Sequence, residues 1–150
     1  MNRRDTKIGV LLVDDDRDVR ELLAELLTQE GYHVIMAANA EEALARLETV
    51  IPDLVVSDLM MPVMDGAELL ARLSSDARYA AIPTILLTAA GELMAERAVA
   101  EAHLRTLVVH KPIRIGDFLH LVSWRLQNAQ AIAMPAAGAS EAAGDERNLD

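Results

Sequence analysis

Polar side chains stand at the ends of four apolar runs in this sequence. Asp14 and Asp15 follow residues 8–13, Asp58 closes 54–58, Thr88 closes 83–88, and Lys111 follows 106–110. Such a set can transfer a phosphoryl group, because a carboxylate can attack phosphorus while a metal and a lysine neutralise the equatorial oxygens and a hydroxyl donates a hydrogen bond. Asp58 is the best nucleophile candidate, because it is a single carboxylate followed by a loop whose carbonyls can also bind a metal.

The same carboxylates predict a metal site. Asp14 and Asp15 would meet Asp58 if their strands are neighbours. Like charges a few ångströms apart repel strongly, so a cation or raised pKa values must compensate. A hard divalent ion held by carboxylates, a backbone carbonyl and water is the simplest solution, and Mg²⁺ fits it best.

Each polar position also has a simpler interpretation when it is taken alone. An acidic pair after a strand is commonly a helix cap, because aspartate is stabilising at helix N-termini. Thr88 before small residues is typical of a turn, and Lys111 before proline is typical of a surface charge. These interpretations give no reason for all four strand ends to agree, and the joint pattern therefore favours one site.

Five strand-like runs alternate with five segments of helical character along the chain. The strands are expected at 8–13, 32–37, 54–58, 83–88 and 106–110, and the helices at 19–27, 39–48, 67–73, 92 to about His103, and 115 to about Ala129. In the first helix, an inward stripe is predicted at Val19, Leu22, Leu23, Leu26 and Leu27. Asn39 followed by Glu42 has the form of an N-cap with a capping box. The alternation predicts a three-layer α/β sandwich with right-handed crossovers.

Composition limits the other possibilities. A chain of 150 residues is one domain, with no apolar run near the ~20 residues that a membrane span needs. A net charge of −10 argues against nucleic-acid binding, and the absence of cysteine excludes thiolate metal sites and fits a reducing, cytoplasmic setting. Residues 131–150 are rich in Ala and acidic residues and are expected to be a disordered tail; residues 1–6 are an N-terminal extension, and 7–130 form the domain.

With these motifs in place, the sequence resembles a receiver domain of the two-component response-regulator family, of the single-domain, CheY-like kind. The resemblance covers residues 7–130 and is carried by the acidic pair, Thr88, Lys111 and the run Asp-Leu-Met-Met-Pro-Val-Met-Asp-Gly from Asp58 to Gly66. It implies a flavodoxin-like sheet of order 2-1-3-4-5. It also implies a phosphoacceptor signalling protein that catalyses only its own phosphorylation and dephosphorylation, with a histidine kinase or histidine phosphotransfer protein as donor and an unidentified protein as target.

The resemblance also assigns roles to individual residues. Asp58 matches the phosphoacceptor, Asp14 and Asp15 the metal-binding pair with Asp15 the closer ligand, and Met60 the residue that lends its backbone carbonyl to the metal. Thr88 matches the hydroxyl that moves toward the phosphoryl group, with Ala89 as its small neighbour. Lys111 matches the lysine that pairs with the phosphate, and its bond to Pro112 is commonly cis in the family.

Two departures from the family pattern concern how a signal is read out. Val108 stands where an aromatic residue usually rotates inward, and Ile113 replaces an aromatic residue common after Lys-Pro. A receiver-like scaffold that binds its partner regardless of phosphorylation is therefore an alternative. A further alternative is an aspartate-nucleophile phosphatase of the haloacid-dehalogenase type, although Asp18 stands where that motif, counted from Asp14, requires Thr or Val.

Overall fold

The computed structural model describes residues 7–89, 92–101 and 104–129. The extension predicted at 1–6, the tail predicted at 131–150 and the helix end predicted at His103 lie outside these residues. Within them, no helix combines the length and the apolar character needed to cross a bilayer.

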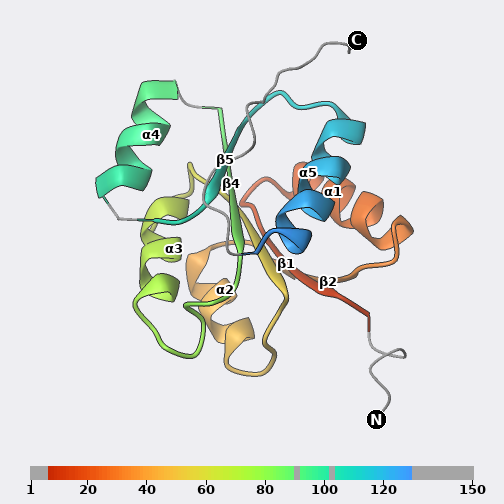
Figure 1. Ribbon diagram of the computed structural model, residues 1–150, viewed down its shortest axis with the longest axis horizontal. Helices are drawn as coiled ribbons and strands as arrows, with labels where there is room; N and C mark the ends of the chain where they lie inside the picture. Colours follow the sequence, from red (N-terminus) through yellow and green to blue (C-terminus); the bar gives the residue numbers. More distant parts are fainter. Residues whose placement is uncertain (1–6, 90–91, 102–103, 130–150) are drawn as a thin grey trace.

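Five parallel strands and five helices alternate within the described residues, as the apolar runs predict (Figure 1). The strands are β1 Gly9–Val13, β2 His33–Ala37, β3 Leu54–Asp58, β4 Thr84–Thr88 and β5 Leu107–His110. The helices are α1 Arg17–Gln29, α2 Ala40–Leu47, α3 Gly66–Ser74, α4 Glu92–Glu101 and α5 Ile115–Gln127. The strand order is β2-β1-β3-β4-β5, which confirms the predicted order 2-1-3-4-5 and the doubly wound α/β fold.

Element boundaries differ from the sequence prediction by one or two residues, and the differences have local causes. β4 begins at Thr84 because Pro83 has no N–H for the ladder, although its carbonyl still accepts from the N–H of Val55 at 3.1 Å. Asn39 caps α2 as predicted, and its side-chain oxygen accepts from the N–H of Glu42 at 2.8 Å. The Glu42 carboxylate in turn accepts from the N–H of Ala38, one residue before the cap.

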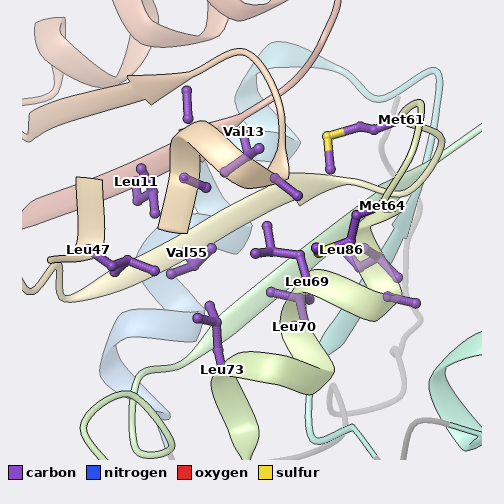
Figure 2. Close-up of a cluster of buried hydrophobic side chains, with 14 of the residues drawn as sticks. Leu11, Val13, Leu47, Val55, Met61, Met64, Leu69, Leu70, Leu73 and Leu86 are labelled. Carbon is purple, nitrogen blue, oxygen red and sulfur yellow. The ribbon is translucent and has the colours of Figure 1, made fainter. Parts of the chain in front are cut away.

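Helices cover both faces of the sheet and create two separate cores. Figure 1 shows α1 and α5 on one side and α2, α3 and α4 on the other. Alternate residues of β1 divide between them: Val10 and Leu12 belong to the core under α1 and α5, whereas Leu11 and Val13 belong to the core under α2 and α3. Figure 2 shows the second core, where Leu69, Leu70 and Leu73 of α3 pack toward the sheet. Because both faces are covered, the central strand β3 is buried along its whole length.

The stripe predicted on α1 is only partly correct. Leu27 is buried and Leu23 packs against the core, but Leu22 is 51% exposed. Ala24 is buried in the same helix. A small residue lets the helix backbone approach the sheet closely, so the contact stripe is centred on Ala24 and Leu27 and leaves Leu22 on its outer side.

A buried arginine closes the amino-terminal edge of the sheet. The Arg125 side chain of α5 is fully buried, and its Nε donates to the carbonyl of Thr84 at 3.0 Å. Its two terminal nitrogens donate to the carbonyls of Arg105, Asn128 and Ala129 at 2.9–3.1 Å. Burial, with a smaller contribution from the charge of Arg105, lowers the pKa of Arg125. The guanidinium thereby ties the end of α5 to the start of β4.

Candidate functional site

The strand register brings the predicted polar residues to one edge of the sheet. Val13 of β1 pairs with Ser57 of β3, so the following residue Asp14 lies beside Asp58. On the other side of β3, Asp58 pairs with Leu87, one residue before Thr88. The carbonyl of Thr88 accepts from the N–H of Lys111 at 2.8 Å, so the residue after β5 lies beside the end of β4. This is the carboxyl edge, where open α/β sheets bind their ligands.

Asp14, Asp15 and Asp58 form a compact group of carboxylates. One oxygen from each lies within 4.8 Å of the others, with Asp14 and Asp58 buried and Asp15 exposed. Asp14 Oδ1 accepts from the N–H of Asp16 at 2.9 Å, while Asp14 Oδ2 is buried without a hydrogen-bond donor. Burial, followed by the charges of Asp58 and Asp15, raises the pKa of Asp14, although the Asp16 hydrogen bond and Lys111 oppose the rise.

The third aspartate of the run has a different function. The Asp16 carboxylate accepts from the N–H groups of Asp18 at 3.0 Å and Val19 at 3.3 Å, and so caps α1. The simpler helix-cap interpretation of an acidic cluster therefore applies to Asp16 and not to Asp14.

Lys111 is the cation of the site. Its Nζ lies 2.8 Å from Asp58 Oδ1 and 3.7 Å from Asp14 Oδ2. Burial alone would lower the pKa of Lys111, but the hydrogen bond and charge of Asp58, followed by Asp14, outweigh it and leave the pKa raised. The ammonium is thus held charged over the carboxylates, and the peptide bond from Lys111 to Pro112 is cis.

The remaining predicted residues lie around this group. Thr88 is buried at the end of β4, and the next residue, Ala89, is exposed. Met60 lies two residues after Asp58, and its side chain is 55% exposed. The register places Thr88 at the same edge as Asp58, and Met60 belongs to the loop that leaves this edge.

Two contacts that support the site are not evident from the sequence. Arg20 of α1 donates from Nη1 to the carbonyl of Asp14 at 2.7 Å, and this bond fixes the turn that carries the acidic pair. At Gly66, an added Cβ would lie 2.2 Å from the carbonyl oxygen of Asp58 and 2.8 Å from Leu86 Cδ1. Only glycine allows α3 to begin this close to the backbone of Asp58. The Asp65-Gly66 pair predicts a turn, but not this contact.

The loop between Asp58 and α3 contains a strained turn. Val63 has φ of 70°, and the carbonyl of Pro62 accepts from the N–H of Met64 at 2.8 Å. A hydrogen bond between residues two apart around a positive φ defines a rare, strained form of the γ-turn. Met61 and Met64 are both buried on either side, whereas the side chain of Val63 is 99% exposed. The buried methionines hold the turn in place.

The donor set suits a hard divalent cation. Three carboxylates that approach within 4.8 Å, one with a buried oxygen that accepts no hydrogen bond, supply the ligands and the unbalanced charge that such an ion satisfies. Lys111 balances only part of this negative charge. The arrangement therefore combines a buried carboxylate, a fixed ammonium and a cation-binding group around one point.

Comparison with known proteins identifies the family. The family model for the response regulator receiver domain matches residues 10–123. The chain belongs to this family. Receiver domains are phosphoacceptor signalling domains that bind Mg²⁺ at an acidic cluster, and the group of Asp14, Asp15 and Asp58 corresponds to that cluster. The family interacts in general with histidine kinases or phosphotransfer proteins.

Solved receiver structures share the fold over nearly their whole length. A CheY-like response regulator receiver domain protein from Methanospirillum hungatei has a TM-score of 0.75 at 27% identity, over 83% of this chain and 98% of that one. A putative response regulator from Chloroflexus aurantiacus has a TM-score of 0.74 at 32% identity, over 81% and 99% of the two chains.

Curated relatives extend beyond the matched segment. Response regulator Rre1 from Synechocystis is 46% identical over 85 residues, which cover 56% of this chain and 37% of that protein. The match spans less than two thirds of the length of this and other curated relatives.

Proposed function

We propose that this chain accepts a phosphoryl group onto Asp58 and signals through contacts with another protein. The donor is the phosphohistidine of a sensor kinase or a histidine phosphotransfer protein. The proposal rests chiefly on the Lys111 ammonium, which lies 2.8 Å from the buried Asp58 carboxylate within the acidic group. Residues 7–130 carry this activity, and residues 131–150 are proposed to be a disordered tail.

The chain's own residues perform the transfer. A carboxylate oxygen of Asp58 attacks phosphorus, and the donor nitrogen of histidine leaves with the electron pair of the P–N bond. The Lys111 ammonium is already paired with Asp58, and it stabilises the negative charge on the oxygens of the transferred phosphoryl group. The Thr88 hydroxyl donates a hydrogen bond to one of these oxygens. Hydrolysis of the resulting mixed anhydride returns the carboxylate and ends the signal.

Asp14 and Asp15, with the backbone carbonyl of Met60 and Asp58 itself, would hold Mg²⁺. When bound, this ion neutralises negative charge on the phosphoryl group as it is transferred. Arg20 and Asp16 support this half of the site, because they fix the carbonyl and one carboxylate oxygen of Asp14.

Labelling with an acyl phosphate tests the proposal. Purified protein with acetyl phosphate and Mg²⁺ should gain one acid-stable, base-labile phosphoryl group, seen by intact-protein mass spectrometry. Asp58→Asn and chelation of Mg²⁺ should each abolish the label, whereas Asp117→Asn, which changes an exposed carboxylate on α5, should retain it. Equal labelling of Asp58→Asn would refute the assignment.

A second candidate is a receiver-like scaffold that binds its partner regardless of phosphorylation. Val108, which is half-buried against the core under α2 and α3, favours it because valine has no ring to rotate. Once a partner has been captured, its affinity for phosphorylated protein, unphosphorylated protein and Asp58→Asn should be equal under this hypothesis. A difference of tenfold or more between the first two would favour the phosphorylation switch.

A further inference from the structure

An apolar cavity of about 430 Å³ adjoins the proposed phosphoryl site. It lies between α1, the end of β4 and the segment that joins β5 to α5, on the side of the sheet that α1 and α5 cover (Figure 1). Its lining includes Val19, Leu23, Ala89, Lys111, Ile113 and Phe118. Cavities of a few hundred cubic ångströms are of the size that binds small molecules.

The cavity and the acidic group share one residue. Lys111 lines the cavity, and its Nζ also contacts Asp58 at 2.8 Å. Ala89, which follows Thr88 directly, lines the cavity as well and has only a methyl side chain. Because the two share Lys111, the cavity opens beside the point where a phosphoryl group held by Lys111 and attacked by Asp58 would lie.

The composition of the lining limits the ligand. Lys111 is the charged residue among the lining side chains, and it faces the acidic group. The other lining residues are apolar, so they offer no side-chain hydrogen bonds to a sugar, a nucleotide or a polar peptide. A ligand that combines an anionic phosphoryl group with a short apolar substituent matches both the Lys111 ammonium and the apolar lining.

We infer that the cavity receives the apolar acyl group of an acyl phosphate, so that this receiver uses acyl phosphates longer than acetyl phosphate as preferred small-molecule phosphodonors. The inference rests on the proposed function and names a substrate class for the same site. In the reaction, an Asp58 oxygen forms a bond to phosphorus, and the bond between phosphorus and the acyl oxygen breaks. The carboxylate of the acyl group leaves with the electron pair, and no proton transfer or redox partner is needed.

The test compares two donors whose leaving groups have similar basicity. Acetyl phosphate and butanoyl phosphate differ by two methylene groups, so a difference between them reports binding and not intrinsic reactivity. Each fully buried methylene is worth about fourfold in affinity, and partial burial of two gives a KM about tenfold lower for butanoyl phosphate. Phosphorylation rates at saturating donor should be alike. Equal KM values for the two donors would overturn the inference, while labelling by acetyl phosphate would still support the proposed function.

A pair of variants on α1 tests whether the cavity causes the preference. Val19→Trp places a large ring at the lining, whereas Leu22→Trp adds the same ring to a neighbouring position that is 51% exposed and does not line the cavity. Val19→Trp should remove the tenfold preference, taken as the ratio of the two KM values within one variant, and Leu22→Trp should keep it. Circular dichroism verifies that each variant is folded. A preference that survives Val19→Trp, or one that both variants lose, would overturn the inference.

Discussion

Replacing Asp14 by asparagine is expected to stabilise the protein when no divalent cation is present. Asp14 is buried, its Oδ2 accepts no hydrogen bond, and its pKa is raised by burial and by the neighbouring carboxylates. A raised pKa means that the folded protein binds this proton more tightly than the unfolded chain does. The associated stability is therefore complete below the unfolded value of 3.8 and is lost as the pH rises through the raised folded pKa.

The structure sets the size of the effect. Two charges at 4.8 Å repel by about 3.5 kcal/mol at an effective dielectric constant of 20, and Asp14 has two such neighbours. The attraction between Asp14 and Lys111 at 3.7 Å offsets about 4.5 kcal/mol of this repulsion at the same dielectric constant. Because Asp15 is exposed and its repulsion is reduced by solvent, a net gain of about 2 kcal/mol is expected for Asp14→Asn at pH 7.

Urea denaturation followed by circular dichroism, in buffer with a chelator, measures this gain directly. The advantage of Asp14→Asn should shrink as the pH falls through the raised pKa of Asp14, because the wild-type carboxyl then becomes protonated. Saturating Mg²⁺ should stabilise the wild type more than the variant, because the ion needs the carboxylate. Asp18→Asn is the matched control: it removes an exposed charge in the first turn of α1 and should cost a few tenths of a kcal/mol. An Asp14→Asn protein less stable than the wild type at pH 7 without Mg²⁺ would refute the reasoning.

Three further substitutions probe features of the fold. Val63→Gly should raise the free energy of unfolding by about 1 kcal/mol in urea titrations, because the side chain is exposed and the positive φ is strained; a loss of stability would show that Val63 is not under strain. Gly66→Ala should destabilise by about 2 kcal/mol and slow labelling of Asp58 by acetyl phosphate, since the new methyl group meets the Asp58 carbonyl, and wild-type behaviour in both assays would contradict the close contact. Arg125→Met should lower stability by about 3 kcal/mol because the four carbonyls lose their donor, while Arg46→Met, at an exposed position in the last turn of α2, should change it by only a few tenths of a kcal/mol; equal effects would argue against a special role for Arg125.

The alternation of apolar runs and helical segments predicts the α/β architecture and places the acidic residues and Lys111 at one edge of the sheet, whereas the strand order that makes β1 and β3 neighbours is implied by the family resemblance. Each strand is an apolar run that ends in a turn or a charge, so the run itself identifies both the strand and the polar residue at its end. The prediction of Asp14, Asp58 and Lys111 at one edge depends only on parallel pairing, which the alternation of strands and helices implies.

Features that depend on how closely elements approach could not be predicted in this way. Leu22 belongs to the same apolar stripe as Leu23, and its exposure follows from the small size of Ala24, which lets α1 settle at a particular rotation. Arg20 lies four residues before Ala24 and seven before Leu27, on the face of α1 that is turned toward the sheet, and its acceptor is a backbone carbonyl that carries no sequence signal. The positive φ of Val63 is likewise set by the burial of Met61 and Met64 on both sides of it.

The position of Arg125 determines where the domain can be joined to something else. Its guanidinium holds the carbonyl of Ala129 next to Thr84, the first residue of β4, whereas Thr88 at the other end of that strand marks the reactive edge. A five-residue strand spans about 16 Å. A fluorophore, affinity tag or second domain attached directly to Ala129 therefore starts on the opposite rim and leaves the approach of a phosphodonor open. Attachment through the turn after β1 or β3 would obstruct that approach.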